Sequence, residues 1–139
     1  MSERGSSLIN PGDLSEEELY YELNIRNQNV DESKQQKIER LRRILQSERN
    51  CLDNWKTERH MGEELSTVNR KLDEIEGGLK GNIQVKWISQ LRHWRERIHR
   101  TKTIDLAEEE QKFEVLVRIS KLIEIYKKIG KETNELKRH

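Results

Sequence analysis

The side chains best suited to chemistry are the arginines and tryptophans gathered between residues 82 and 103. This stretch holds six basic residues and a single acid, Glu96. Trp87 and Trp94 are seven residues apart, so they share one face of a helix. Because arginine holds phosphates and tryptophan stacks on bases, the stretch is a candidate nucleic-acid surface. Its candidate contacts are Arg92, Arg95, Arg97 and Arg100.

A second interpretation of the same residues is structural. The two tryptophans then belong to the core, and the arginines line a solvated face. There they pair with the acidic first helix or with Glu108–Glu110. Faces of a single charge sign are usually solvated, which favours this interpretation. The sequence leaves both interpretations open.

Other side chains offer little for catalysis. The single cysteine, Cys51, and the four histidines have neither Cys-x-x-Cys spacing nor two histidines four residues apart, so we expect no metal site. Cys51 lies beside Leu52 on a helical stripe, where a small buried role is usual. The glycines of residues 77–81 lack the Walker spacing that cradles phosphates. We therefore expect no cofactor and no enzymatic activity.

Composition favours an all-α fold. Of the 139 residues, 32% are apolar and 38% are charged, and the only proline is Pro11. Proline interrupts helices, so the rest of the chain is free to be almost entirely helical. An abundance of Glu, Lys, Arg and Leu is typical of long helices and coiled coils. With so thin a core, we expect some apolar surface to need a partner.

Charge and cysteine content indicate the class of partner and the compartment. Residues 1–31 hold seven acids and two bases, opposite in sign to the 82–103 stretch. This segregation suggests another copy of the chain, or an anionic polymer, as partner. A lone cysteine excludes an intrachain disulfide, and no apolar run reaches the roughly 18 residues that cross a bilayer. We expect an intracellular protein, cytoplasmic or nuclear, with no membrane contact.

The first two helices should form a hairpin. Ser15 and Glu18 have the spacing of a capping box, and Asn27 begins the turn that ends the first helix. Asp31 is placed to cap the second helix, whose apolar stripe changes face near residues 60–62. We expect the helix to break or bend there, because the new stripe no longer continues the old one.

Two further helices complete the predicted bundle. Asn82 can cap the third, and Asp105 with Glu108 can cap the fourth, which should run to about Ile129 or on to Leu136. The fourth helix is apolar over so wide an arc that we expect neighbours on more than one side, as for a central helix. The expected organisation is a flexible lead, a helical hairpin running into a long helix, a helical bundle and a fraying tail, at residues 1–12, 13–50, 51–130 and 131–139.

Residues 14–45 resemble the SAP box, a pair of short amphipathic helices around a tight loop that binds DNA. The likeness lies in the leucine spacing of the first helix and in the arginine at its end. Basic residues also enter the second helix. Asn27 stands where the family has glycine, and asparagine tolerates the left-handed backbone of such a turn. The resemblance implies nucleic-acid contacts from Arg26, Lys34, Lys37 and Arg40.

The same start recurs in Gag polyproteins of arthropod LTR retrotransposons. It is followed there by a charged coiled-coil segment and a short helical segment similar to Trp87–Ile98. This chain keeps that order and lacks a Cys-His zinc knuckle. It resembles the N-terminal region of such a Gag protein, SAP-like plus coiled-coil, or a domesticated Gag-derived protein. The resemblance implies a structural, self-associating role linked to nucleic acid.

The function that we expect is that of a non-enzymatic scaffold that forms homo-oligomers through helical seams. The alternatives are a nucleic-acid-binding module and a helical adaptor that presents a groove to another protein. The seams should be built from apolar residues at helical spacing: Leu52, Trp55, Leu65, Val68, Leu72, Ile75, Val115, Leu122 and Ile129.

Overall fold

Helices make up most of the chain that the structure describes. The structure is a computed structural model that describes residues 9–28, 30–47, 59–78 and 84–137, with residues 130–137 described by their backbone alone. These ranges contain no strand, which confirms the all-α expectation. None of their helices has the length and apolar character needed to cross a membrane. In chain order they hold a 3₁₀ turn, Pro11–Asp13, and the helices α1 (Glu16–Asn24), α2 (Lys34–Ser47), α3 (Met61–Gly78), α4 (Lys86–Arg100) and α5 (Leu106–Lys137).

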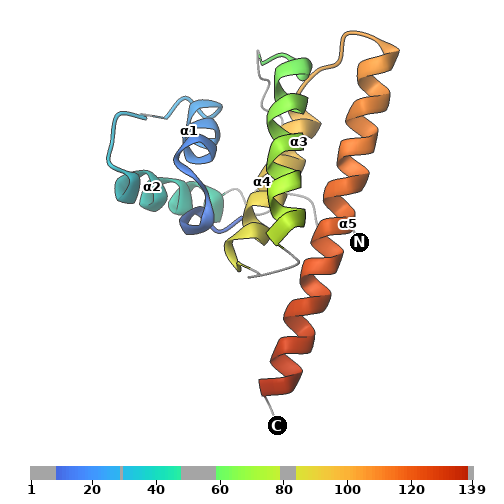
Figure 1. Ribbon diagram of the computed structural model, residues 1–139. Helices are drawn as coiled ribbons and strands as arrows, with labels where there is room; N and C mark the ends of the chain where they lie inside the picture. The colour runs from blue at the N-terminus through green and yellow to red at the C-terminus, as the bar shows by residue number, and fades with distance from the viewer. Residues whose placement is uncertain (1–8, 29, 48–58, 79–83, 138–139) are drawn as a thin grey trace.

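The helices form two groups that meet at α4 (Figure 1). α1 and α2 pair at one side of the molecule, while α3, α4 and α5 form a bundle at the other. α4 contacts α3, α5 and the 3₁₀ turn, and ten of its fifteen residues are buried. The expectation that the last helix is central is therefore wrong. α4 takes that place, and α5 lies at the edge of the bundle.

The predicted start of α1 and the turn after it are confirmed. The amide of Glu18 donates to Ser15 Oγ at 3.3 Å, and the amide of Ser15 donates to the Glu18 carboxylate at 2.9 Å. Each bond satisfies a backbone group that the helix itself leaves unpaired. Asn27 adopts the left-handed conformation, with φ 57°. Asparagine tolerates this conformation better than most other non-glycine residues.

α2 begins later than expected and has a different cap. The amide of Gln36 donates to Ser33 Oγ at 3.2 Å, and the amide of Ser33 donates to the Gln36 side chain at 3.1 Å. A capping box needs Glu or Gln three residues after the cap. Lys34 holds that position for Asp31, whereas Gln36 holds it for Ser33. The prediction that Asp31 caps the second helix is therefore wrong.

The start of α3 confirms the predicted break, while α4 starts later than expected. Residues 59–60 are not helical and α3 begins at Met61, within the segment where the apolar stripe changes face. α4 begins at Lys86 with Val85 at its N-cap and no capping side chain. The expected cap, Asn82, lies outside the described residues.

α5 reaches the farther of the two ends that the sequence offered. Asp105 caps it as predicted, because its carboxylate accepts the amide of Glu108 at 2.8 Å. The helical backbone then continues past Ile129 to Lys137, through most of the tail that was expected to fray. At 1.5 Å per residue, these 32 residues span about 48 Å. Figure 1 shows the C-terminal part of α5 projecting beyond the other helices of the bundle.

Part of the expected flexible lead packs against α4. Ile9 is buried, and the amide of Asn10 donates to Ser89 Oγ at 2.9 Å. The side chain of Gln90 donates to the carbonyl oxygen of Asp13 at 2.9 Å. The segment before α1 therefore connects the α1–α2 pair to the middle of the bundle.

The described residues form two apolar cores. The smaller joins α1 and α2, and the larger joins α3, α4 and α5. Trp87 and Trp94 both belong to the larger core, which confirms the structural interpretation of these two residues. Gly78 permits the close approach of Trp87, because a Cβ at position 78 would lie 1.8 Å from an indole carbon. The larger core also contains most of the predicted seam residues.

Candidate functional site

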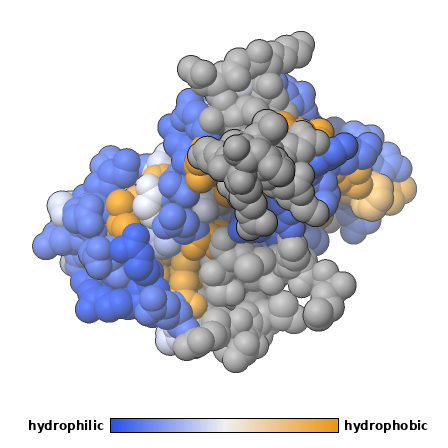
Figure 2. All heavy atoms as spheres, turned by 90° about the horizontal axis from the view of Figure 1, so that it is seen from below, coloured by the Kyte–Doolittle hydropathy of each residue, from blue (hydrophilic) through white to orange (hydrophobic). Residues whose placement is uncertain are grey.

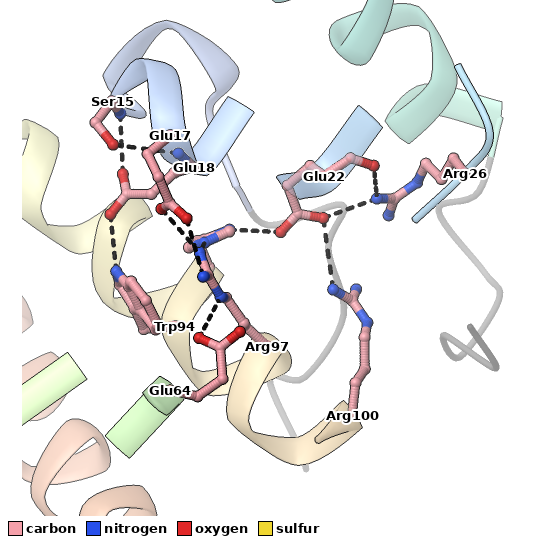
Figure 3. Close-up of polar contacts among 10 residues, drawn as sticks. Ser15, Glu17, Glu18, Glu22, Arg26, Glu64, Trp94, Arg97 and Arg100 are labelled. Atoms are coloured by element: carbon pink, nitrogen blue, oxygen red, sulfur yellow. Dashed lines mark hydrogen bonds and ion pairs between the residues drawn. The ribbon is translucent and has the colours of Figure 1, made fainter. Parts of the chain in front are cut away.

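Polar contacts between α1 and α4 involve many of the charged residues that the sequence singled out (Figure 3). Glu18 and Glu22 are one helical turn apart and both face α4. Glu18 accepts a hydrogen bond from the indole nitrogen of Trp94 at 2.8 Å, and Glu22 lies 2.6 Å from Nδ1 of His93. All four side chains are buried. The acidic first helix is therefore the partner of the basic one.

Arg97 lies at the centre of this network and is 2% exposed. Its two Nη atoms donate to the two carboxylate oxygens of Glu17 at 2.9 Å each, and its Nε donates to Glu64 at 2.9 Å. Its guanidinium also lies over the rings of Tyr21 and Trp94, 4.3 and 4.1 Å from their centroids. Burial by itself lowers the pKa of Arg97, but the two carboxylates outweigh it and raise that pKa.

Glu22 brings three basic side chains to one buried carboxylate. Its oxygens lie 2.6 Å from His93, 2.7 Å from Arg26 and 3.6 Å from Arg100. Burial raises the pKa of the Glu22 carboxyl. The hydrogen bond and charge of His93, with the charges of Arg100 and Arg26, outweigh burial and hold that pKa well below its ordinary value. The carboxylate therefore stays ionised in the interior.

The nucleic-acid candidates of α4 point into the protein rather than onto an open basic surface. Arg97 and Arg100 pair with carboxylates of α1. Arg26, in the turn that follows α1, pairs with a carboxylate of α1 as well. Arg95 is 9% exposed, with its Nε 3.7 Å from Glu96. Arg92 is half-buried. The predicted phosphate-binding face of this helix is largely an internal contact.

The candidates of α2 lie on a different element. Lys34 is exposed and Lys37 is half-buried. Arg40 pairs with Glu32, its Nε donating at 3.2 Å. The fold thus brings Arg26, Arg97 and Arg100 together around α1 but leaves Lys34, Lys37 and Arg40 apart from them.

Sequence reasoning offered the acidic first helix as a partner but did not single out the carboxylates that pair with these arginines: Glu17, Glu22 and Glu64. The available signal was the spacing of Glu18 and Glu22 on a helix whose charge is opposite to that of α4. Within the described ranges, no group of three or more histidine, cysteine, aspartate or glutamate side chains is arranged to hold a metal ion. The network is therefore a set of ion pairs and hydrogen bonds.

A second candidate site is an apolar groove on the outward side of α5, beside the end of α4. Its volume is about 640 Å³. Phe113 is 68% exposed and Ile125 is 44% exposed. Figure 2 shows apolar surface at the right-hand end of the molecule, where α5 lies, beside surface that is mostly hydrophilic. The lining consists of His99 from α4 and of Phe113, Leu116, Val117, Ser120, Lys121, Glu124 and Ile125 from α5.

Comparisons with protein families, curated proteins and solved structures found no match to this chain. The groove and the charge network must therefore be interpreted from their own geometry.

Most of the predicted seam residues are buried by contacts within a single copy of the chain. Six of them are buried in the core that joins α3, α4 and α5. Ile129 is half-buried near the projecting end of α5. Leu52 and Trp55 lie outside the described residues. The six buried seam residues are Leu65, Val68, Leu72, Ile75, Val115 and Leu122.

Proposed function

We propose that the protein is a non-enzymatic helical scaffold that associates with copies of itself through the outward face of α5. The observation that supports this most directly is the groove of about 640 Å³, which is apolar at Phe113, Val117 and Ile125. A second helix laid over it would remove this surface from water, and that removal drives association. Large exposed apolar patches are uncommon on proteins that act alone.

The contacts within one chain favour this face over the seams expected from the sequence. Leu65, Val68 and Leu72 of α3 already pack against α4 and α5. Association through them would require the bundle to open. The outward face of α5 needs no such rearrangement, because its apolar side chains are exposed in a single chain.

The resemblance to arthropod Gag proteins supports the same role from a different direction. It implies a structural protein that self-associates, and we extend the proposal to a Gag-derived scaffold on that ground. A long helix at the edge of a bundle, with one face open, suits such a role because helices pack readily along their length.

Nucleic-acid binding has less support from the contacts. Arg26, Arg97 and Arg100 face carboxylates of α1, at 2.7 to 3.6 Å. A phosphate would have to displace those carboxylates before it could bind there. A helical adaptor for another protein would use the same α5 groove without self-association, and the experiment below separates that case.

The proposal is tested by light scattering across concentration on the full chain and on Phe113→Lys. We expect a concentration-dependent mass that rises above 16.7 kDa for the unaltered chain, and a monomer for the variant. Lysine at 113 follows Glu109 by four residues, so it supports the helix while placing a charge in the groove.

The matched control is Tyr20→Lys. Tyr20 is also an exposed aromatic residue on a helix, and it also follows a glutamate, Glu16, by four residues. It lies on α1, outside the groove. We expect this variant to associate like the unaltered chain. A strict monomer for the unaltered chain at high concentration would reject self-association and favour the adaptor.

A further inference from the structure

The outward side of α5 has charges of opposite sign on the two sides of the groove. Glu109 and Glu110 are exposed before the groove residue Phe113, and Lys128 is exposed after the groove residue Ile125. Along the helix, the groove therefore lies between exposed acids on one side and an exposed base on the other. A surface with this arrangement is complementary to a copy of itself turned end for end.

We infer that two copies pair through α5 in antiparallel orientation, around a two-fold axis near residue 119; this rests on the proposed self-association. Phe113 lies six residues before that position and Ile125 six after it. Glu110 lies nine before it and Lys128 nine after it. In this register Phe113 meets Ile125 of the partner copy, and Glu110 meets Lys128 of the partner copy.

The centre of the same register is also compatible. Val117 and Lys121 lie two residues before and after the axis, and both line the groove. Lysine can lay its apolar stem over a valine while its ammonium group reaches water. Glu114 and Glu124 would be opposite in sequence. Glu114 also lines a recess beside α3 with Leu65 and Arg118. A parallel pair would likewise bring each of these acids beside its own copy, so they do not favour either orientation.

A parallel pairing lacks these advantages. It would place Glu110 beside its own copy and Lys128 beside its own copy, and like charges in contact are repulsive. In a parallel pair Phe113 and Ile125 would each meet an identical residue, so the apolar contacts alone do not favour either orientation. The charges decide the orientation, because only the antiparallel pair converts both repulsions into attractions.

Cysteine cross-linking tests the orientation on the full chain, with Cys51→Ser removing the natural thiol. The variants are Glu110→Cys and Lys128→Cys, each treated with a short bis-maleimide alone and as an equal mixture. In the antiparallel pair a residue at 110 lies about 27 Å along the axis from its own counterpart, at 1.5 Å per residue. We expect efficient cross-linking of the mixture and little of either variant alone.

The outcomes separate this inference from the proposed function. Cross-linking of each variant with itself would establish a parallel pair and overturn the inference, while self-association would stand. A dimer by light scattering that cross-links in none of the three samples would also overturn this register. A monomer by light scattering would reject the proposed function itself.

Charge reversal provides a second measurement that does not depend on cross-linking. We expect Glu110→Lys to weaken association by about tenfold, because two pairs in each dimer change from attraction to repulsion. Adding Lys128→Glu should restore it, since the reversed charges again face opposite ones. A double variant that binds more weakly than Glu110→Lys would contradict the antiparallel register.

Discussion

At the scale of single residues, the protein places charged side chains in its interior, and several of them pair with an opposite charge. Glu22 contacts Arg26, His93 and Arg100, while Arg97 joins Glu17 to Glu64. Buried ions are costly to remove from water, and excellent geometry is what compensates that cost. The network therefore fixes how α1 sits on α4 more than it adds net stability.

Removal of the Glu22 charge should be severe. We expect Glu22→Gln to lower the free energy of unfolding by about 3–5 kcal/mol, because it leaves buried cations without their carboxylate. The control is Glu39→Gln, which breaks a 3.1 Å pair with Arg42 on the surface of α2. That change should cost less than about 1 kcal/mol. Urea unfolding followed by far-ultraviolet circular dichroism measures both, and equal effects would contradict the buried network.

Acid should destabilise the protein through the same carboxylates. The pKa of Glu22 in the folded chain lies below its ordinary value of 4.5, and that of Glu17 is also lowered. Protons therefore bind the unfolded chain first as the pH falls. The stability that these groups supply is intact above about pH 4.5 and is lost as the pH falls from there toward the folded pKa.

The measurement is the free energy of unfolding between pH 6 and pH 3. We expect it to fall below about pH 4.5, and to fall less steeply in Glu22→Gln, which has one titrating carboxyl fewer. A free energy that stays level or rises in this range would show that the carboxylates are not held in their ionised form.

At the scale of elements, the sequence predicted what depends on near neighbours. The capping box of Ser15 with Glu18 and the cap at Asp105 need only residues a few positions apart, so they could be foreseen. The cap of α2 was misassigned because Asp31 is a good capping residue in isolation. The deciding feature was Gln36, three residues after Ser33.

The role of α4 could not be foreseen in the same way. Local spacing shows that a helix is basic, but it left two acidic segments, the first helix and Glu108–Glu110, as possible partners and did not indicate Glu64. The glutamates that bury Arg97 lie about 80 and 33 positions away in the chain. The wide apolar arc of α5 was visible in the sequence, yet only the fold shows which part of it is left uncovered. The apolar character of the groove could therefore be predicted from the sequence, but its position on the surface could not.

The contact between α3 and α4 yields a sharp test at this scale. Gly78→Ala places a Cβ 1.8 Å from an indole carbon of Trp87, whereas a Cβ at Gly77 meets nothing within 4 Å. We expect Gly78→Ala to lower the free energy of unfolding by about 1–3 kcal/mol through overpacking. Gly77→Ala should be neutral or slightly stabilising, because alanine favours helix. Thermal unfolding of the two variants compares them directly, and equal midpoints would argue against this packing.

At the scale of the whole molecule, α4 is surrounded and α5 is open. The α1–α2 pair covers one side of α4 through ion pairs, and α3 with α5 covers the rest through apolar contacts. This arrangement leaves the arginines of the basic helix engaged within the chain. It leaves the outward face of α5 as the surface on which we propose that another copy packs.

The most direct test of this account is methyl nuclear magnetic resonance of the full chain, recorded over a series of dilutions. The account predicts that the methyl signals of Val117 and Ile125 shift with concentration, because a second copy covers them. The signals of Val68 and Ile75 should stay constant, since these residues are buried within one chain. Signals of Val117 and Ile125 that do not move, or a shift confined to Val68 and Ile75, would contradict the account.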